Sequence, residues 1–124
     1  MKFLLLVAHG SRREVSNDEI RILAKRLQAM NHPFAEIGCA FLEIAQPSIQ
    51  EALHRLIADG AKEIVVLPYF LSAGRHVATD IPEQIKQVKN QYPNVKIGIA
   101  TYLGASEMIA ELVMKQALEK LSAI

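Results

Sequence analysis

Short apolar blocks alternate with stretches of helical spacing four times along the chain. The apolar runs at residues 3–7 and 64–67 are continuous, which is typical of strands buried on both faces. Residues 35–42 and 95–100 supply two further strands. After each strand, apolar side chains recur at intervals of three and four residues, which predicts a helix.

Short sequence signals predict where these helices begin. Ser16 with Glu19, and Asp80 with Glu83, have the spacing of a capping box, in which two side chains satisfy backbone amides at a helix start. Pro47 suits the first turn of the second helix, because an amide hydrogen is not needed there. The other expected boundaries are helix ends at Asn31–Pro33 and Gly60 and a helix start near Ala105.

This alternation of strands and helices predicts a parallel sheet joined by right-handed crossovers, with helices on both faces. The expected fold is an α/β, three-layer, flavodoxin-like domain with a four-stranded parallel sheet. At 124 residues, the chain can bury roughly two-thirds of its unfolded surface. No internal repeat or linker divides it, so residues 1–124 are expected to form a single domain.

Composition narrows the class of protein. Apolar residues make up 51% and charged residues 22%, which indicates a globular protein and not a disordered one. The formal net charge of +1 disfavours a nucleic-acid binder with a broad basic face. Cys39 is the only cysteine, so an internal disulfide is excluded and a small, buried strand residue is the favoured interpretation.

The N-terminal apolar run superficially resembles a signal peptide. It is too short for one, because His9 ends it after six apolar residues and a secretory core needs roughly 7–15. No stretch approaches the ~20 apolar residues of a membrane span. A cytoplasmic protein is therefore expected.

Three residues that can bind a divalent metal follow the first three predicted strands. In an open parallel sheet, ligands bind beyond the carboxyl ends of the strands, so His9, Glu43 and His76 are expected to meet at one edge. Imidazole and carboxylate together suit first-row divalent metals. Taken singly, such residues are more often loop hydrogen-bonding groups or solvated acids, and the prediction depends on their convergence.

The other two histidines are not expected to take part. His32 lies in a loop that leads to the opposite edge of the sheet, and His54 lies within a predicted helix beside its apolar stripe. We interpret His54 as a surface residue.

The same loops carry groups that favour an anionic ligand. A glycine-containing loop with arginines before a helix offers backbone amides and guanidinium groups to carboxylate or phosphate. The pattern matches neither a Walker loop nor a dinucleotide-binding turn. The candidate substrate-binding residues are Ser11, Arg12, Arg13, Ser72, Gly74 and Arg75.

These loops also carry a resemblance to a known family. The segments Ala8-His9-Gly10-Ser11-Arg12, Phe41-Leu42-Glu43 with Pro47-Ser48-Ile49, and Leu67-Pro68-Tyr69-Phe70-Leu71 through Gly74-Arg75-His76-Val77 to Asp80-Ile81-Pro82 resemble the class II chelatases. The similarity is to the short sirohydrochlorin chelatases of the CbiX type, and it covers essentially the whole chain. It implies a chelatase-like domain.

The resemblance implies a lyase that inserts Co2+, Ni2+ or Fe2+ into sirohydrochlorin in cobalamin or sirohaem biosynthesis. No ATP and no cofactor beyond the metal substrate are implied, and the short members pair as homodimers. The positions of His9 and His76 are the catalytic and metal-site histidines of the family, and the position of Glu43 is a further metal ligand in related chelatases. No nucleic-acid or membrane partner is expected.

Two other functions stay open at this point. A non-catalytic carrier of a tetrapyrrole or a metal would use the same loops without accelerating insertion. A phosphate-binding module of flavodoxin-like architecture would need no metal ligands. In either chelatase or carrier, the apolar side chains of Tyr69, Phe70 and Leu71 could contact the macrocycle or belong to the core.

Overall fold

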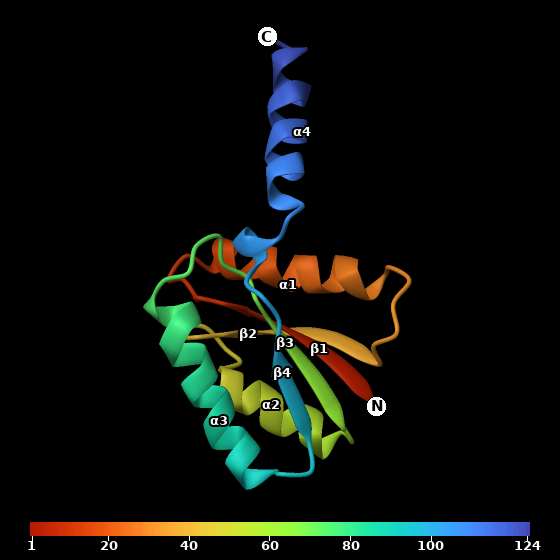
Figure 1. The fold of residues 1–124 in the computed structure, drawn as a ribbon, viewed down its shortest axis with the longest axis vertical. Coiled ribbons are helices and arrows are strands. Elements are labelled where there is room, and N and C mark those ends of the chain that lie inside the picture. The colour runs from red at the N-terminus through yellow and green to blue at the C-terminus, as the bar shows by residue number, and fades with distance from the viewer.

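The computed structural model describes all of residues 1–124 and confirms the α/β architecture with a four-stranded parallel sheet (Figure 1). The strand order is β2-β1-β3-β4, so the two continuous apolar runs form the central strands. The four strands are β1 (Lys2–Ala8), β2 (Glu36–Phe41), β3 (Glu63–Pro68) and β4 (Lys96–Ile99).

Helices lie on both faces of this sheet, as predicted (Figure 1). One face is covered by a single helix, which packs mainly on β2, and the other face is covered by two helices that pack against each other. These helices are α1 (Glu14–Gln28), α2 (Ile49–Ala58) and α3 (Ile81–Gln91). All four strands run parallel, which places the loops after β1, β2 and β3 at one edge of the sheet.

Both predicted capping boxes are wrong. The first helix begins at Glu14, two residues before Ser16, and its N-cap Arg13 makes no side-chain hydrogen bond. Before α3, a π-helical turn, η1 (His76–Asp80), runs directly into the helix. The first amides of α3 can therefore bond to the preceding turn, and Asp80 makes no capping bond.

The capping box that does form was not predicted. Ser48 is the N-cap of α2, its side chain accepts a hydrogen bond from the Glu51 amide, and the Glu51 carboxylate accepts one from the Ser48 amide. That backbone hydrogen bond lowers the pKa of Glu51. Pro47 precedes the N-cap and does not stand in the first turn as expected.

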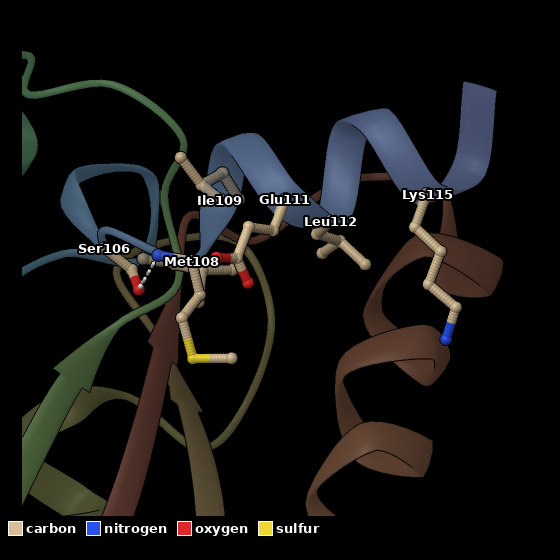
Figure 2. Close-up of a pocket in the computed structure, with 7 residues that line it drawn as sticks. Ser106, Met108, Ile109, Glu111, Leu112 and Lys115 are labelled. Carbon is tan, nitrogen blue, oxygen red and sulfur yellow. Dashed lines mark hydrogen bonds between the residues drawn. The ribbon is translucent and has the colours of Figure 1, made fainter. Parts of the chain in front are cut away.

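The last helix, α4 (Ile109–Leu121), follows a short 3-10 turn, η2 (Leu103–Ala105), and begins four residues after the predicted start. It does not cover the sheet: it projects from the domain and ends at the C-terminus (Figure 1). Its first turns and η2 enclose an open hollow of about 340 Å³ that Ile109 and Leu112 help to line (Figure 2). No residue of α4 is buried.

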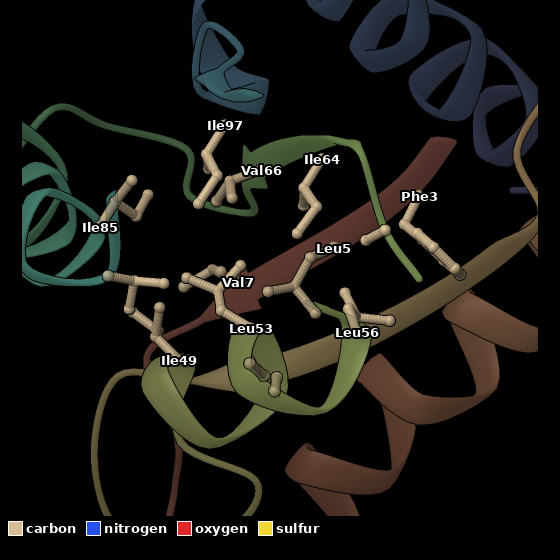
Figure 3. Close-up of a cluster of buried hydrophobic side chains, with 14 of the residues drawn as sticks. Phe3, Leu5, Val7, Ile49, Leu53, Leu56, Ile64, Val66, Ile85 and Ile97 are labelled. Atoms are coloured by element: carbon tan, nitrogen blue, oxygen red, sulfur yellow. The ribbon is translucent and has the colours of Figure 1, made fainter. Parts of the chain in front are cut away.

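The main hydrophobic core lies between the sheet and α2–α3 (Figure 3). It contains 15 buried side chains, and Figure 3 shows Leu5, Val7, Leu53 and Leu56 converging from β1 and α2. The cluster beneath α1 has three buried members. Cys39 lies at its margin, half-buried, and burial raises the pKa of its thiol. None of the helices has both the length and the apolar character needed to cross a bilayer.

Candidate functional site

The first two loops at the carboxyl edge are held together through their main chains. The Leu42 amide donates to the Ala8 carbonyl at 2.9 Å, and the Glu43 amide donates to the His9 carbonyl at 3.0 Å. Gly10 has φ +96°, and a Cβ atom at this position would lie 1.8 Å from the Glu43 carbonyl oxygen. Only glycine therefore permits this approach, which fixes the spacing of His9 and Glu43.

The structure brings the three predicted metal-site residues together. His9 Nε2 lies 3.0 Å from Glu43 Oε1, and the His9 and His76 rings face each other with centroids 4.7 Å apart and planes tilted by 39°. Each side chain is about half exposed, so the group is open to solvent. A ligand can reach the two imidazoles and the carboxylate without unfolding any element.

His76 is held by a fourth residue, Asp80, which the sequence pattern predicted to be a helix cap. His76 Nδ1 lies 2.8 Å from Asp80 Oδ2, one π-helical turn away. The Asp80 carboxylate is therefore free of the predicted cap and engages the imidazole. The four-residue spacing of these two side chains was the available signal, and the capping-box pattern obscured it.

The loop that carries His9 has a second support, Asn17, which was also missed. Asn17 is the only buried residue with a polar side chain. This side chain accepts a hydrogen bond from the Ser11 amide at 2.9 Å and donates one to the Ser11 carbonyl at 2.8 Å. Arg21, from the same helix, donates to the Gln46 carbonyl in the second loop at 3.1 Å. Because α1 holds both loops, the site depends on that helix.

Two hollows flank the imidazole pair. One, of about 270 Å³, is lined by Glu43 and His76 together with the acidic side chains of Asp80 and Glu83. The other, of about 290 Å³, is lined by His9, Ser11, Asn17 and Tyr69 among others. No lysine or arginine lines the first hollow, which suits a cation.

The predicted substrate-binding residues are more dispersed than the metal-site residues. Ser11 lines the second hollow, where its amide and carbonyl are both engaged by Asn17. The other five are exposed and line neither of the two hollows: Arg12, Arg13, Ser72, Gly74 and Arg75.

The apolar part of the third loop is divided between core and surface. Phe70 packs against the main core, whereas Tyr69 and Leu71 are exposed. The η2 turn anchors this loop, because the Gly104 amide donates a hydrogen bond to the Phe70 carbonyl at 2.9 Å. The two segments approach so closely that a Cβ atom on Gly104 would lie 1.9 Å from the Leu71 carbonyl oxygen.

The other two histidines lie outside the site. His32 bonds to the Gln28 carbonyl at the end of α1. His54 is not the surface residue that was expected: its ring packs edge-on against Tyr92, and Nδ1 lies 3.1 Å from the Tyr92 hydroxyl. In this structure His9 pairs with Glu43 and His76 pairs with Asp80, and no three of these side chains stand in the arrangement of a metal-holding group.

Comparison with known proteins identifies the family of the chain. The CbiX family model matches residues 3–120. The chain is 37% identical over 119 residues to the sirohydrochlorin cobaltochelatase of Sulfolobus acidocaldarius, a match that covers 96% of the chain and 92% of the relative. It is 30% identical over 117 residues to the sirohydrochlorin ferrochelatase of Priestia megaterium, with coverage of 94% of the chain and 43% of that relative.

Solved structures show the same fold. A CbiX protein of Marinobacter aquaeolei superposes with a TM-score of 0.86 at 25% identity, and each chain is covered completely. The sirohydrochlorin chelatase SirB of Bacillus subtilis subspecies spizizenii, solved in complex with cobalt, superposes with a TM-score of 0.82 at 27% identity. That match covers 95% of this chain and 50% of the other.

Proposed function

The chain belongs to the CbiX family and is a sirohydrochlorin chelatase, and we propose that His9, Glu43 and His76 form its metal-handling site. The reaction is the insertion of cobalt or iron in tetrapyrrole biosynthesis, and the metal is a substrate. The alternative of a phosphate-binding module has no support in the site, since the hollow beside His76 is lined by acids.

The observation that carries the proposal is the spacing of His9 and Glu43. Two ligands that each lie roughly 2.1 Å from one ion, at a right angle, are roughly 3.0 Å apart. His9 Nε2 and Glu43 Oε1 are 3.0 Å apart. We infer that a divalent ion replaces their direct contact and that the neighbouring His76 ring turns to supply a third ligand.

The chemistry of insertion matches the groups present. The ion must lose water, the macrocycle must bend so that its nitrogens point outward, and two pyrrole protons must leave. A neutral imidazole can accept a proton or hold the ion near neutral pH. We assign His9 as ligand and base, His76 as its partner on the same side, and Glu43 as the group that balances the charge of the ion.

Finer features of the function extend this proposal. We propose that insertion proceeds without ATP, with Co2+, Ni2+ or Fe2+ as the metal. The carboxylates of sirohydrochlorin would be received by the amides at the start of α1 and by Arg12, Arg13 or Arg75, whose side chains are exposed. We also propose that the protein acts in the cytoplasm. We propose further that it forms a homodimer, because a half-exposed site on a small domain encloses little of a tetrapyrrole.

The test follows the absorbance change of sirohydrochlorin with Co2+ or Fe2+. We expect His9→Ala and His76→Ala to lower the insertion rate by at least about 100-fold, the lower range for a lost general base. His32→Ala, outside the site, should leave the rate unchanged. Wild-type rates in both site variants would refute the site. Binding of sirohydrochlorin without accelerated insertion in the wild type would support the carrier alternative.

A further inference from the structure

The two histidines of the proposed site contact carboxylates through different ring nitrogens. His9 uses Nε2, which lies 3.0 Å from Glu43 Oε1. His76 uses Nδ1, which lies 2.8 Å from Asp80 Oδ2. The nitrogen that is left unengaged is therefore Nδ1 in His9 and Nε2 in His76. Because the contacts differ in this way, the two carboxylates can have different tasks.

Asp80 has no other partner in the structure. Its side chain makes no capping bond at the start of α3, and its one ion pair is with His76. No lysine or arginine lines the hollow that Asp80 shares with His76. Since neither the helix start nor a basic side chain engages this carboxylate, the contact with His76 is its role in the fold.

The main chain holds both partners of this contact in place. The Ile81 amide donates to the His76 carbonyl and so closes the π-helical turn. Ile81 is fully buried in the main core, directly after Asp80. π-helical turns are rare and are found frequently at functional sites. The imidazole and the carboxylate thus stand on one turn that is anchored in the core.

We infer that Asp80 is the positioning residue of His76 and fixes the tautomer in which Nδ1 carries the hydrogen. This inference rests on the proposed function. In a neutral imidazole one nitrogen donates and the other accepts, and an ionised carboxylate can only accept. Asp80 therefore favours the hydrogen on Nδ1, and the lone pair of Nε2 is left to bind the ion.

Glu43 has a different task at the same site. Its contact occupies Nε2 of His9, the nitrogen that the proposed ion takes, so metal binding ends that contact. Asp80 engages the other side of the His76 ring, so its contact can persist while Nε2 binds the ion. When the His76 ring turns toward the ion, the correct nitrogen is already free of hydrogen. Asp80 supports the site in this way without touching the metal.

The first test determines the tautomer of His76 in the metal-free protein. Two-bond 1H–15N spectra are recorded at about pH 8, where a free imidazole with a pKa of about 6.5 is neutral. The loss of signals in His76→Ala assigns them. We expect the hydrogen on Nδ1 in the wild type and in Asp80→Asn, whose amide oxygen can still accept it. Asp80→Ala should show a mixture of the two tautomers.

The control for this test is Asp59→Ala. It removes the carboxylate of another pair four residues apart, Arg55 and Asp59 at the end of α2, and should leave the His76 signals unchanged. A hydrogen on Nε2 of His76 in the wild type, or the wild-type tautomer in Asp80→Ala, would overturn the inference. No metal is present, so this outcome is independent of the proposed function.

The second test titrates each protein with Co2+ alone. Asp80→Ala should weaken Co2+ binding about 10- to 100-fold, as is typical when the partner of a ligating histidine is removed. Asp80→Asn should retain most of the affinity, because it restores the acceptor without the charge. Asp59→Ala should bind Co2+ as the wild type does.

The variants separate failure of the positioning role from failure of the site. Wild-type affinity in Asp80→Ala together with weak binding in His76→Ala overturns the positioning role. An equal loss in Asp80→Asn and Asp80→Ala overturns it too, because the charge of Asp80 and not its hydrogen bond would then support the ion. Wild-type affinity in both Asp80→Ala and His76→Ala overturns the proposed metal site.

Discussion

The face of the sheet under α2 and α3 holds 15 buried side chains, whereas the face under α1 holds three. Both faces belong to the same four strands, and β1 contributes alternate residues to each. The difference arises because two helices cover one face and a single helix, set over β1 and β2, covers the other. Buried contacts are thus concentrated on the face under α2 and α3, whereas the opposite face depends on α1.

Neighbouring leucines of β1 provide the sharpest test of this asymmetry. Leu5 and Leu6 are 1% and 2% exposed but point to opposite faces. Truncation to alanine costs about 2–5 kcal/mol in buried sites, and we expect Leu5→Ala near the upper end and Leu6→Ala near the lower end. The thinner layer around Leu6 can relax into the space that is left. Urea unfolding at one fixed protein concentration measures both, and equal losses would contradict the comparison.

The substitution Asn17→Ala tests how far the site depends on the face under α1, which has the smaller core. Asn17→Ala leaves the Ser11 amide and carbonyl without their partner, which should cost about 1–3 kcal/mol. Lys25→Ala, on the exposed side of the same helix, serves as the control. If both variants unfold at the wild-type urea concentration, Asn17 does not hold the loop.

The helix starts on the two faces should also differ. Ser48→Ala removes the side-chain cap of α2 and should destabilise the protein by about 1 kcal/mol. Ser16→Ala should have little effect, since Ser16 caps nothing at the start of α1. Thermal unfolding of the two variants side by side measures the difference, and a larger loss in Ser16→Ala would reverse our assignment.

The smallest expected effect belongs to the open part of the sheet. Gly98→Ala should stabilise the isolated chain by about 0.4–1 kcal/mol, because its added methyl group meets nothing and the unfolded chain loses freedom. Gly104→Ala should have the opposite sign, as its Cβ atom would collide with Leu71. Unfolding at low protein concentration separates this effect from assembly, and a destabilised Gly98→Ala would show that the face is already filled.

The sequence predicts the strands and their common edge because both follow from simple rules. Continuous apolar runs mark buried parallel strands, and parallel strands end on the same side, so the meeting of His9, Glu43 and His76 could be anticipated. The rule requires no knowledge of side-chain conformation.

What the sequence does not predict are choices between competing local bonds. Asp80 could cap α3 or engage His76, and only the π-helical turn decides between them. Asn17 reads as one more polar position in an amphipathic helix, although it is buried and clamps a loop. The apolar pattern of α4 predicts a helix that packs on the protein, whereas none of its residues is buried in the chain.

The hydrogen bond from the Glu43 amide to the His9 carbonyl sets how far apart these two residues lie. It does so independently of the side chain that residue 43 carries. The bond uses only backbone atoms, and Gly10 admits it whatever side chain stands at residue 43. A substitution at that position therefore exchanges one side chain for another at the proposed metal site, while the main chain of the two loops stays unchanged. Metal preference can in this way drift over evolutionary time by single replacements, without a new arrangement of the loops.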